Sequence, residues 1–320
     1  MSRSASFPGV LVLTGASGFI GSALLEAALA QGWRVRVLTR SSAKWKRPHP
    51  LLEVFEGDLA VDQDWSRLVI GADVVVNAAA EIAQNYAMYQ VNVTGPLNLL
   101  HAALDAGVGR WVQLSSVGAY GSVDAGLVTE QWPDQPVGAY ETTKTEFDRA
   151  LKAACLSGST QYCIVRPSNV YGPNMRNQSI RQMIHMIRRG WFVFMGSPGA
   201  SANYVHVDDV VSATLLCMSH PRAANHTYIV SAWASIEDMV QAIASHSGVT
   251  CPSKRLNLRL AVCTAKLFQK WPGWPLTLSR IRALSTRSQY ATEKIESELG
   301  WRASVSMAEG MKQMTMAKSS

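Results

Sequence analysis

The stretch V-L-V-L-T-G-A-S-G-F-I-G, residues 10–21, decides the fold class of this chain. It opens with an apolar, β-rich run, and residues 22–31 after it have helical character. Between them lie three glycines at three-residue spacing, Gly15, Gly18 and Gly21. A strand, a glycine turn and a helix in this order are typical of a dinucleotide site, because the glycines let the backbone approach a pyrophosphate and the helix N-terminus points its amides at it. The stretch therefore predicts a nucleotide-binding α/β fold.

Short apolar runs alternate with helical stretches through the rest of the first half. The runs cover residues 35–39, 52–55, 74–77, 111–115 and 162–166, and the helical stretches lie near 64–69, 85–107 and 139–155. This alternation predicts a parallel sheet covered on both faces. Later helices are predicted near residues 177–189, 208–218 and 235–246. We expect an α/β fold with a doubly wound Rossmann domain over residues 1–166 and a smaller, mostly helical substrate-binding lobe over residues 167–320.

Composition narrows the class of protein. Of the 320 residues 48% are hydrophobic, enough for a core, but no apolar run reaches the roughly 20 residues that span a bilayer. The polar N-terminus does not resemble a secretory signal. The five cysteines show no C-x-x-C spacing and the seven histidines no metal-binding pair, so neither a disulfide framework nor a metal site is predicted. We expect a cytoplasmic protein without a transmembrane segment and without a metal.

The net charge of +7 and the pI near 9.2 predict an anionic partner. Cofactor and sugar-nucleotide pyrophosphates have that charge, and so do nucleic acids and lipid headgroups; we expect a small molecule and no nucleic acid. Basic residues gather late in the chain among leucines and tryptophans. Such a segment can form a membrane-surface element. We favour the alternative, a helical lobe that packs its apolar side on the core. The basic residues are Lys254, Arg255, Arg259, Lys266, Lys270, Arg280, Arg282 and Arg287, and the apolar ones are Leu256, Leu258, Leu260, Leu267, Phe268, Trp271 and Trp274.

Tyr140 and Lys144 stand one helical turn apart in Y-E-T-T-K, so the phenol and the ammonium share a helix face. A phenol with a pKa of about 10 is a poor base at neutral pH, but a nearby cation favours the phenolate. Tyr140 is therefore a candidate acid and base for alcohol and ketone chemistry.

With these motifs the chain resembles the extended short-chain dehydrogenase/reductase family, in particular its nucleotide-sugar branch, over nearly its whole length. The resemblance implies that Tyr140 is the catalytic acid/base and that Lys144 lowers its pKa and binds the nicotinamide ribose. It implies that the third catalytic residue is Ser116 in Q-L-S-S-V-G-A-Y-G, four residues before the tyrosine of that segment, rather than Ser115, for which turn capping is the alternative role. The resemblance also implies that residues near 204–230 belong to the nucleotide-binding domain. A homodimer is expected.

The end of the second predicted strand indicates the cofactor. A NAD site usually has an Asp or Glu about 20 residues after the first glycines, where it binds the ribose 2'-hydroxyl. Here T-R-S-S follows the strand, with Lys44 close behind and no acid. Arg40 would attract a 2'-phosphate, so NADP is predicted, with NAD as the alternative. The full set of cofactor-binding residues that we expect is Gly15, Ser17, Gly18, Phe19, Ile20, Gly21, Arg40, Lys44, Asp58, Leu59, Ala78, Ala79, Ala80, Lys144 and Pro167.

Family roles extend to further positions. Asp58 stands where the family binds the adenine amino group, and Asn92 where an asparagine supports the active site, with a buried helix amide as its alternative role. R-P-S-N-V-Y-G-P, residues 166–173, resembles a nucleotide-sugar segment and implies that Asn169 contacts the diphosphate or the sugar; the alternative is a capping asparagine. The substrate-binding residues that the resemblance implies are Ser116, Tyr140, Asn169, Arg280 and Arg282.

A second segment, A-N-Y-V-H-V-D-D at residues 202–209, departs from the family pattern. Ala202 replaces the arginine that binds diphosphate in many epimerases, so we expect Arg280 or Arg282 to supply that charge. His206, Asp208 and Asp209 are interpreted as strand-end and helix-cap residues.

The residues that follow Ser116 narrow the range of possible reactions further. In the family that the chain resembles, 4,6-dehydratases have an Asp-Glu pair directly after the catalytic hydroxyl residue, and decarboxylating members have a Glu in this turn. Here Ser116 is followed by V-G-A, which cannot transfer protons, so the resemblance disfavours both of these reactions. The remaining possibilities are a 4-keto reductase and a 4-epimerase of a nucleoside diphosphate sugar, in surface-polysaccharide sugar synthesis. Arg40 favours the reductase. The alternatives are a hydroxysteroid or dihydroflavonol type NADP-dependent reductase and a non-catalytic nucleotide-binding regulator.

Overall fold

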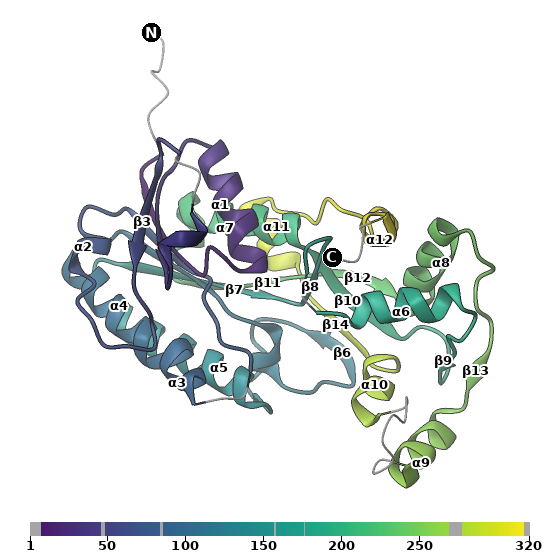
Figure 1. The fold of residues 1–320 in the computed structure, drawn as a ribbon. Coiled ribbons are helices and arrows are strands. Elements are labelled where there is room, and N and C mark those ends of the chain that lie inside the picture. The colour runs from purple at the N-terminus through teal and green to yellow at the C-terminus, as the bar shows by residue number, and fades with distance from the viewer. Residues whose placement is uncertain are drawn as a thin grey trace.

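Strand β1 (Val10–Thr14) lies inside a seven-stranded parallel sheet with the order β11-β7-β5-β4-β1-β2-β3. In this computed structural model, residues 8–45, 49–83, 86–156, 158–175, 177–268 and 277–316 are described. The sheet and its helices form the left half of Figure 1. The other strands are β2 (Arg34–Thr39), β3 (Leu52–Glu56), β4 (Val74–Asn77), β5 (Arg110–Leu114), β7 (Gln161–Pro167) and β11 (His226–Val230). The strand order reverses at β1 and β4, and this is where ligands bind in doubly wound sheets.

Alternating side chains of the strands build two separate cores. Leu11 and Leu13 pack toward one face, and Val12 between them packs toward the other. Both faces are apolar, as expected for parallel strands buried on both sides. One face is covered by α1 (Phe19–Ala30), α7 (Val207–Ser219) and α11 (Glu293–Leu299), and the other by α2 (Ser66–Val69), α4 (Gly95–Asp105) and α5 (Ala139–Cys155).

The helix predicted near residues 85–107 changes its hydrogen-bond pattern along its length. It consists of α3 (Ala87–Tyr89), a π-helical turn over Gln90–Thr94, and α4. Such turns insert a residue into the helical ladder and are frequent at functional sites. Here the turn carries the buried Asn92.

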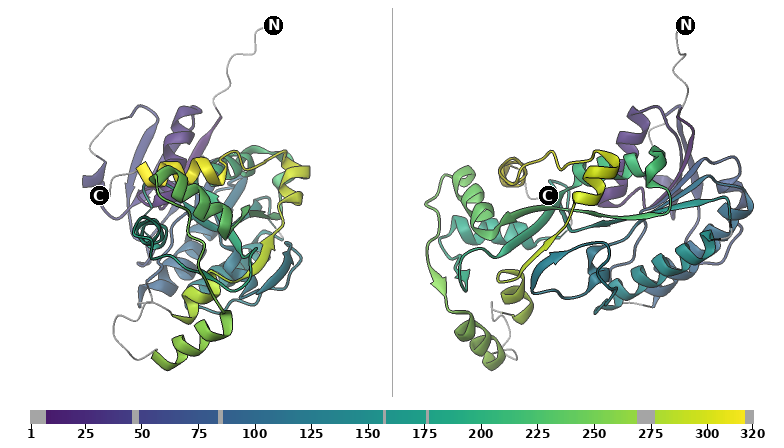
Figure 2. Two further views of the ribbon diagram at one scale, coloured as in Figure 1. Left: turned by 90° about the vertical axis from the view of Figure 1, so that its right-hand side faces the viewer. Right: turned by 180° about the vertical axis from the view of Figure 1, so that it is seen from behind.

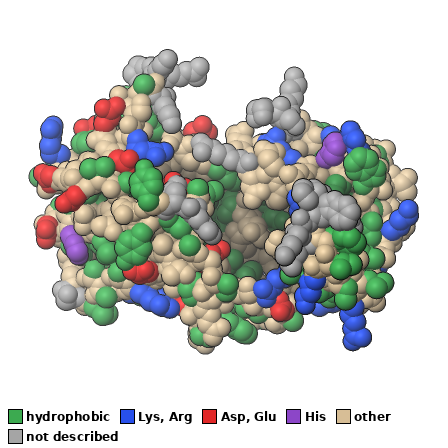
Figure 3. All heavy atoms as spheres, turned by 60° about the horizontal axis from the view of Figure 1, so that its bottom comes forward, with side chains coloured by type: hydrophobic (Ala, Val, Ile, Leu, Met, Phe, Trp, Pro, Cys, Tyr) green, Lys and Arg blue, Asp and Glu red, His purple; other side chains and the backbone are tan. Residues whose placement is uncertain are grey.

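The second lobe combines small sheets with helices, and a hollow separates it from the first (Figure 3). Its core is formed by Ile184, Ile243 and Met311 from three helices packed together. The helices are α6 (Ser179–Arg188), α8 (Ile236–Ser247), α9 (Leu258–Phe268), α10 (Leu278–Ala283) and α12 (Met307–Met316). The strands are β8 (Asn169–Tyr171), β10 (Ser201–His206) and β12 (Ala232–Ser235) in one sheet, β9 (Phe194–Met195) with β13 (Arg255–Leu256), and β6 (Ala125–Val128) with β14 (Arg287–Tyr290).

The expectation that the late leucines pack on the core is wrong for α9. Leu260 is 59% exposed and Leu267 is 76% exposed, because the helix packs through the small side chains of Ala261 and Ala265. Lys270, Trp271 and Trp274 also belong to this late basic and apolar segment, and they lie outside the described residues. Among the described helices, none combines the length and the apolar composition that a membrane span requires.

We predict that Gly21→Ala destabilises the protein although it lies inside a helix. Alanine would gain roughly 0.5–1 kcal/mol of helix propensity, but a Cβ on Gly21 would overlap the carbonyl oxygen of Gly15. Overpacking costs about 1–3 kcal/mol, so the clash outweighs the gain. Urea unfolding measures the difference. The control is Gly109→Ala, whose Cβ would meet the nearest atom at an ordinary 3.4 Å; equal stabilities of the two variants would contradict the packing.

Candidate active site

A pocket of about 250 Å³ opens at the carboxyl ends of β1, β2 and β4. Nine of the residues predicted to bind a cofactor line it: Gly15, Ser17, Gly18, Arg40, Asp58, Leu59, Ala78, Ala79 and Ala80. Thr14, Leu38, Thr39, Gly57, Glu81 and Val91 complete the lining. The structure thus brings the glycine turn, the end of β2 and the alanines after β4 together in one place.

The glycine turn fits a pyrophosphate. Gly15 has a φ of +70°, and a Cβ there would come within 2.6 Å of the backbone of Ala78 and Ala79. Gly18 is the N-cap of α1 and has no side chain that could occupy the first amides of the helix. Those amides and the helix dipole are therefore left to a negatively charged ligand.

A chain of buried hydrogen bonds fixes the floor of this pocket. The Thr14 hydroxyl donates to Asn77 Oδ1 at 2.6 Å and accepts from the Ala79 N–H at 3.1 Å. Asn77 Nδ2 then donates to Gln113 Oε1 at 3.0 Å. These bonds tie the ends of β1, β4 and β5 together, so the backbone of Ala79 is held rigidly beside the glycine turn.

Other predicted cofactor residues lie outside the lining. Phe19 packs against the core of the second lobe, Ile20 against the core under α1, and Gly21 against the turn itself. Pro167 ends β7 and is buried. Lys44 ends a short 3-10 helix over Ser42–Lys44, and its side chain is not described.

The end of β2 carries an exposed arginine and no acid of its own. Arg40 belongs to the pocket lining. A carboxylate that sequence reasoning missed comes from the neighbouring strand: Glu56 accepts a hydrogen bond from the Ser42 N–H at 2.6 Å. The hydrogen bonds from Ser42 lower the pKa of Glu56. Glu56 is engaged by this turn and is not part of the pocket lining.

Asn92 connects the pocket with the helix that carries the tyrosine. Its Oδ1 accepts from the Glu81 N–H at 2.8 Å, and its Nδ2 donates to the Glu81 carbonyl at 2.9 Å and to Thr143 Oγ1 at 3.0 Å. Glu81 lines the pocket and Thr143 directly precedes Lys144. The buried amide thereby sets the distance between the cofactor pocket and α5.

Tyr140 and Lys144 both lie in α5, where burial opposes charge on either group. Burial raises the pKa of Tyr140 to about 12, with Glu141 and Asp148 adding to the effect. Burial also lowers the pKa of Lys144 to about 8, against the opposing effect of Asp148. The expected lowering of the Tyr140 pKa by Lys144 is not seen in the protein alone, where burial is the largest effect on that pKa and raises it. At neutral pH Tyr140 holds its proton.

The two candidate serines have different partners. Ser115 is buried and donates to Asp148 Oδ2 at 2.6 Å. Ser116 is partly exposed and accepts a hydrogen bond from the Gly118 N–H at 3.0 Å, so its hydroxyl proton can be donated elsewhere. Ser116, rather than Ser115, caps the turn. A Cβ on Gly118 would meet Glu141, which sequence reasoning did not place beside this turn.

A buried ion pair that sequence reasoning missed lies behind the catalytic candidates. Asp148 accepts from both Nη2 (3.0 Å) and Nε (3.3 Å) of Arg166, which also reaches Asp134 at 2.7 Å and lies over the ring of Tyr120. Burial raises the pKa of Asp148 although Arg166, Ser115 and Lys144 favour the ionised form. A signal existed in the sequence, since Tyr140, Lys144 and Asp148 are spaced by four residues on one helix face.

The predicted substrate residues are distributed over the second lobe. Asn169 is exposed and its Nδ2 donates to the carbonyl of Asn203 at 3.2 Å. Arg280 reaches Gln182 Oε1 at 3.4 Å, and Arg282 pairs with Asp124 at 2.7 Å. Ala202 is fully buried in the core of the lobe, so this position supplies no charge to a ligand.

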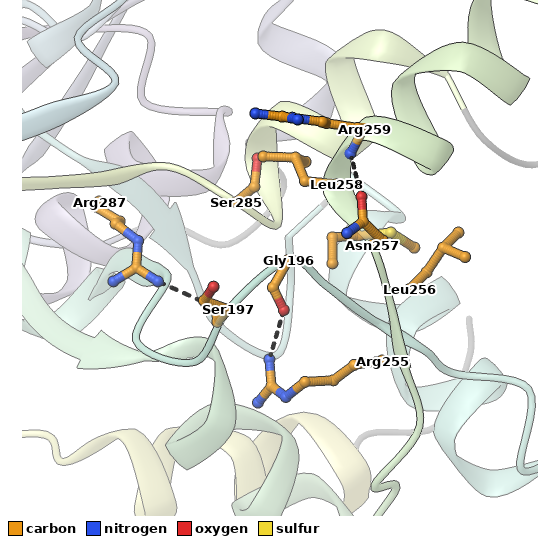
Figure 4. Close-up of a pocket in the computed structure, with 10 residues that line it drawn as sticks. Gly196, Ser197, Arg255, Leu256, Asn257, Leu258, Arg259, Ser285 and Arg287 are labelled. Atoms are coloured by element: carbon orange, nitrogen blue, oxygen red, sulfur yellow. Dashed lines mark hydrogen bonds between the residues drawn. The ribbon is translucent and has the colours of Figure 1, made fainter.

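A larger cavity of about 520 Å³ lies between β9, β13 and the start of α9 (Figure 4). It contains three arginines, two of which hold neighbouring backbone. Arg255 donates to the Gly196 carbonyl at 3.3 Å, and Arg287 donates to the Ser197 carbonyl at 3.1 Å. None of the catalytic candidates lines it.

His206 and Asp209, which were interpreted as strand-end and helix-cap residues, make contacts of that kind. His206 Nδ1 accepts from the Asp208 N–H at 3.3 Å and caps α7. Asp209 accepts from the backbone N–H groups of Ser304 and Val305 and so holds the chain after α11. Within the described residues there is no group of three metal-ligating side chains.

Fold and site together define a nucleotide-binding enzyme of the short-chain dehydrogenase/reductase type. The chain belongs to the NAD dependent epimerase/dehydratase family, whose sequence profile matches residues 11–231. It is 27% identical to the UDP-glucose 4-epimerase of Vibrio cholerae, covering 97% of this chain and 95% of that protein. It is 28% identical to a 3β-hydroxysteroid dehydrogenase/Δ5→4-isomerase of Mycobacterium tuberculosis (strain ATCC 25618 / H37Rv), covering 66% and 60%.

A solved structure shows the same fold across both lobes. The UDP-glucuronic acid 4-epimerase of Bacillus cereus in complex with NAD superposes with a TM-score of 0.75 at 18% identity, covering 95% of this chain and 96% of that one.

The buried ammonium predicts that Lys144→Met stabilises the cofactor-free protein. Below about pH 8 the folded and unfolded chains both hold the Lys144 proton, and only the folded chain bears the cost of burying it. Between pH 8 and 10.5 the unfolded chain holds more protons, so stability rises with pH. The variant should be more stable than the wild type by roughly 2–4 kcal/mol at pH 7, and this advantage should shrink toward pH 10.

Urea unfolding at several pH values measures the stability difference. Lys312→Met is the control, since the Lys312 side chain is 44% exposed and the loss of its charge should leave stability nearly unchanged. A Lys144→Met variant no more stable than the wild type at pH 7 would show that the ammonium is not buried at a cost.

Proposed function

We propose that this protein is a nicotinamide-dependent enzyme acting at C4 of a nucleoside diphosphate sugar, as a 4-keto reductase or, as the second possibility, a 4-epimerase, in surface-polysaccharide sugar synthesis. The main support is the protonated Tyr140 on the same helix as a buried Lys144, connected through Asn92 and Thr143 with a pocket that suits a dinucleotide. The full-length similarity to a UDP-glucose 4-epimerase supports the substrate class.

The proton positions favour the reductase. A nicotinamide cofactor supplies or accepts a hydride when bound. Tyr140, with its pKa raised to about 12, is a proton donor at neutral pH, which a ketone needs as it becomes an alcohol. Ser116 has a free hydroxyl proton with which to hold the same C4 oxygen. Lys144 would hold the nicotinamide ribose.

The diphosphate end is assigned to the second lobe. Arg280, which reaches Gln182, and Arg282, which pairs with Asp124, are the two candidates for the diphosphate. Asn169 is exposed on β8 and would contact the sugar or the diphosphate. Charge-assisted bonds to two phosphates would make substrate affinity sensitive to salt.

The catalytic prediction concerns Tyr140→Phe, which removes only the transferable proton. Turnover should fall by about 10² to 10⁴, while cofactor affinity and unfolding stay close to those of the wild type. The assay is a panel of UDP-, GDP- and dTDP-linked sugars and their 4-keto forms, with NADPH oxidation followed optically and products separated for C4 epimers. Near-normal turnover by the variant would exclude this mechanism.

The same panel separates the possible functions. Consumption of NADPH with a 4-keto sugar indicates the reductase, and interconversion of C4 epimers without net cofactor use indicates the epimerase. The hydroxysteroid relative keeps a steroid or dihydroflavonol reductase as a second candidate, indicated by a silent sugar panel and reduction of such a ketone. Cofactor binding without turnover of any of these compounds would indicate the non-catalytic regulator.

The cofactor prediction concerns Arg40. We propose NADP as the preferred form, since Arg40 lines the pocket where a NAD site usually has an acid; NAD, present in the B. cereus structure, is the alternative. Arg40→Ala should weaken NADPH binding about tenfold to a hundredfold, since charge-assisted bonds are worth about 1.5–3 kcal/mol, and leave NADH binding unchanged. Fluorescence titration with both cofactors measures this, and equal wild-type affinities for the two would rule out the preference.

A cytoplasmic homodimer completes the proposal. It is supported by the resemblance to the extended family and by the five cysteines, all free in the structure. Light scattering of the purified protein gives the oligomeric state directly.

A further inference from the structure

The positive charge of this protein is concentrated in one segment. Residues 239–292 contain eight Lys and Arg residues and no Asp or Glu, whereas the remainder of the chain has 22 basic and 23 acidic residues. The net charge of +7 therefore comes from this segment. Two of its cations are paired with acids from elsewhere, Arg255 with Glu237 and Arg282 with Asp124.

Helix α9 lies within this segment and has an apolar row on its outer side. Ala261 and Ala265 face the lobe and are buried. Leu260 and Leu267, seven residues apart and thus on one line of the helix, face the opposite way and are 59% and 76% exposed. Cys263, between them on this side, is exposed as well. The helix is at the outer corner of the lobe in Figure 1, and in the right-hand view of Figure 2 it is the green helix at the lower left.

Two cations flank this row. Arg259 and Lys266 are exposed and are also seven residues apart, so they form a parallel line about a quarter turn from the leucines. Figure 4 shows Arg259 in the first turn of α9, where its N–H is capped by Asn257 Oδ1 at 2.9 Å. Leucines bordered by cations on the free side of a helix are typical of helices that lie in a membrane interface.

We propose that α9 docks this protein reversibly on an anionic lipid surface. Leu260 and Leu267 enter the boundary between headgroups and acyl chains, and Arg259 and Lys266 contact the anionic headgroups. The helix has 11 residues, about half of what spans a bilayer, so it lies on the surface and does not cross it.

Charge decides between the possible occupants of this face. A second copy of the chain would bring the same cations against each other. A nucleic acid would satisfy the cations and leave the leucines against phosphate or water. An anionic membrane offers both an apolar layer and negative charge, in the order in which the helix presents its groups.

The test is co-sedimentation of the full chain with vesicles of phosphatidylcholine alone and of phosphatidylcholine mixed with phosphatidylglycerol. Binding to the mixed vesicles, weakened by salt, is expected. Leu260→Asn/Leu267→Asn keeps the charge and should weaken binding at least tenfold, since burial of each leucine contributes about a factor of ten or more. Arg259→Gln/Lys266→Gln keeps the leucines and should also weaken binding at least tenfold, at about fivefold for each cation.

The control is Leu156→Asn, which removes a leucine that is 86% exposed just after α5 and should leave binding unchanged. Unchanged unfolding of every variant shows that the effects concern the surface. No sedimentation with the mixed vesicles, or sedimentation that survives loss of both leucines, overturns the proposal. A dimer that Leu260→Asn/Leu267→Asn dissociates, without vesicle binding, would assign this face to a second copy instead. The outcome is independent of the reaction that the enzyme catalyses.

Discussion

The buried ion pair between Asp148 and Arg166 joins the helix that carries Tyr140 to the central sheet. Asp148 lies on α5 and Arg166 on β7, and their two hydrogen bonds fix how the helix lies on the strands. Burying both charges is costly; Asp148 Oδ2 accepts from Arg166 and Ser115, and Arg166 also reaches Asp134, while the buried Asp148 Oδ1 has no hydrogen-bond partner among the described residues. An uncompensated buried charge would remain if either partner were removed, so the contact between α5 and β7 depends on both residues.

Asp148 also affects the pKa values of the candidate catalytic residues Lys144 and Tyr140, although burial has the larger effect on both. Asp148 lies one turn after Lys144 and raises its pKa, opposing the larger effect of burial. It likewise raises the pKa of Tyr140. The phenol consequently keeps its proton and the ammonium holds its proton less firmly than in water. These pKa shifts suit the proposed role of Tyr140 as a proton donor.

The cofactor side depends on a close approach of backbone segments. Gly15 leaves no room for a side chain against Ala78 and Ala79, and the bonds from Thr14 through Asn77 to Gln113 keep that contact in place. Asn92 then relates this floor to α5 through Thr143. Uncharged hydrogen bonds thus connect the predicted cofactor pocket to α5, and a buried ion pair connects α5 to β7.

The sequence by itself determined the sheet, the glycine turn and the helix over Ala139–Cys155, because these follow from short-range periodicity and from where glycine is required. It also predicted Tyr140 and Lys144 from their four-residue spacing, and Ser116 from the resemblance to the family. Only the tertiary structure decided that the pKa of Tyr140 rises, because burial depends on what covers the helix rather than on the neighbour four residues away. Likewise, only the packing of α9 through Ala261 and Ala265 determined that Leu260 and Leu267 face outward.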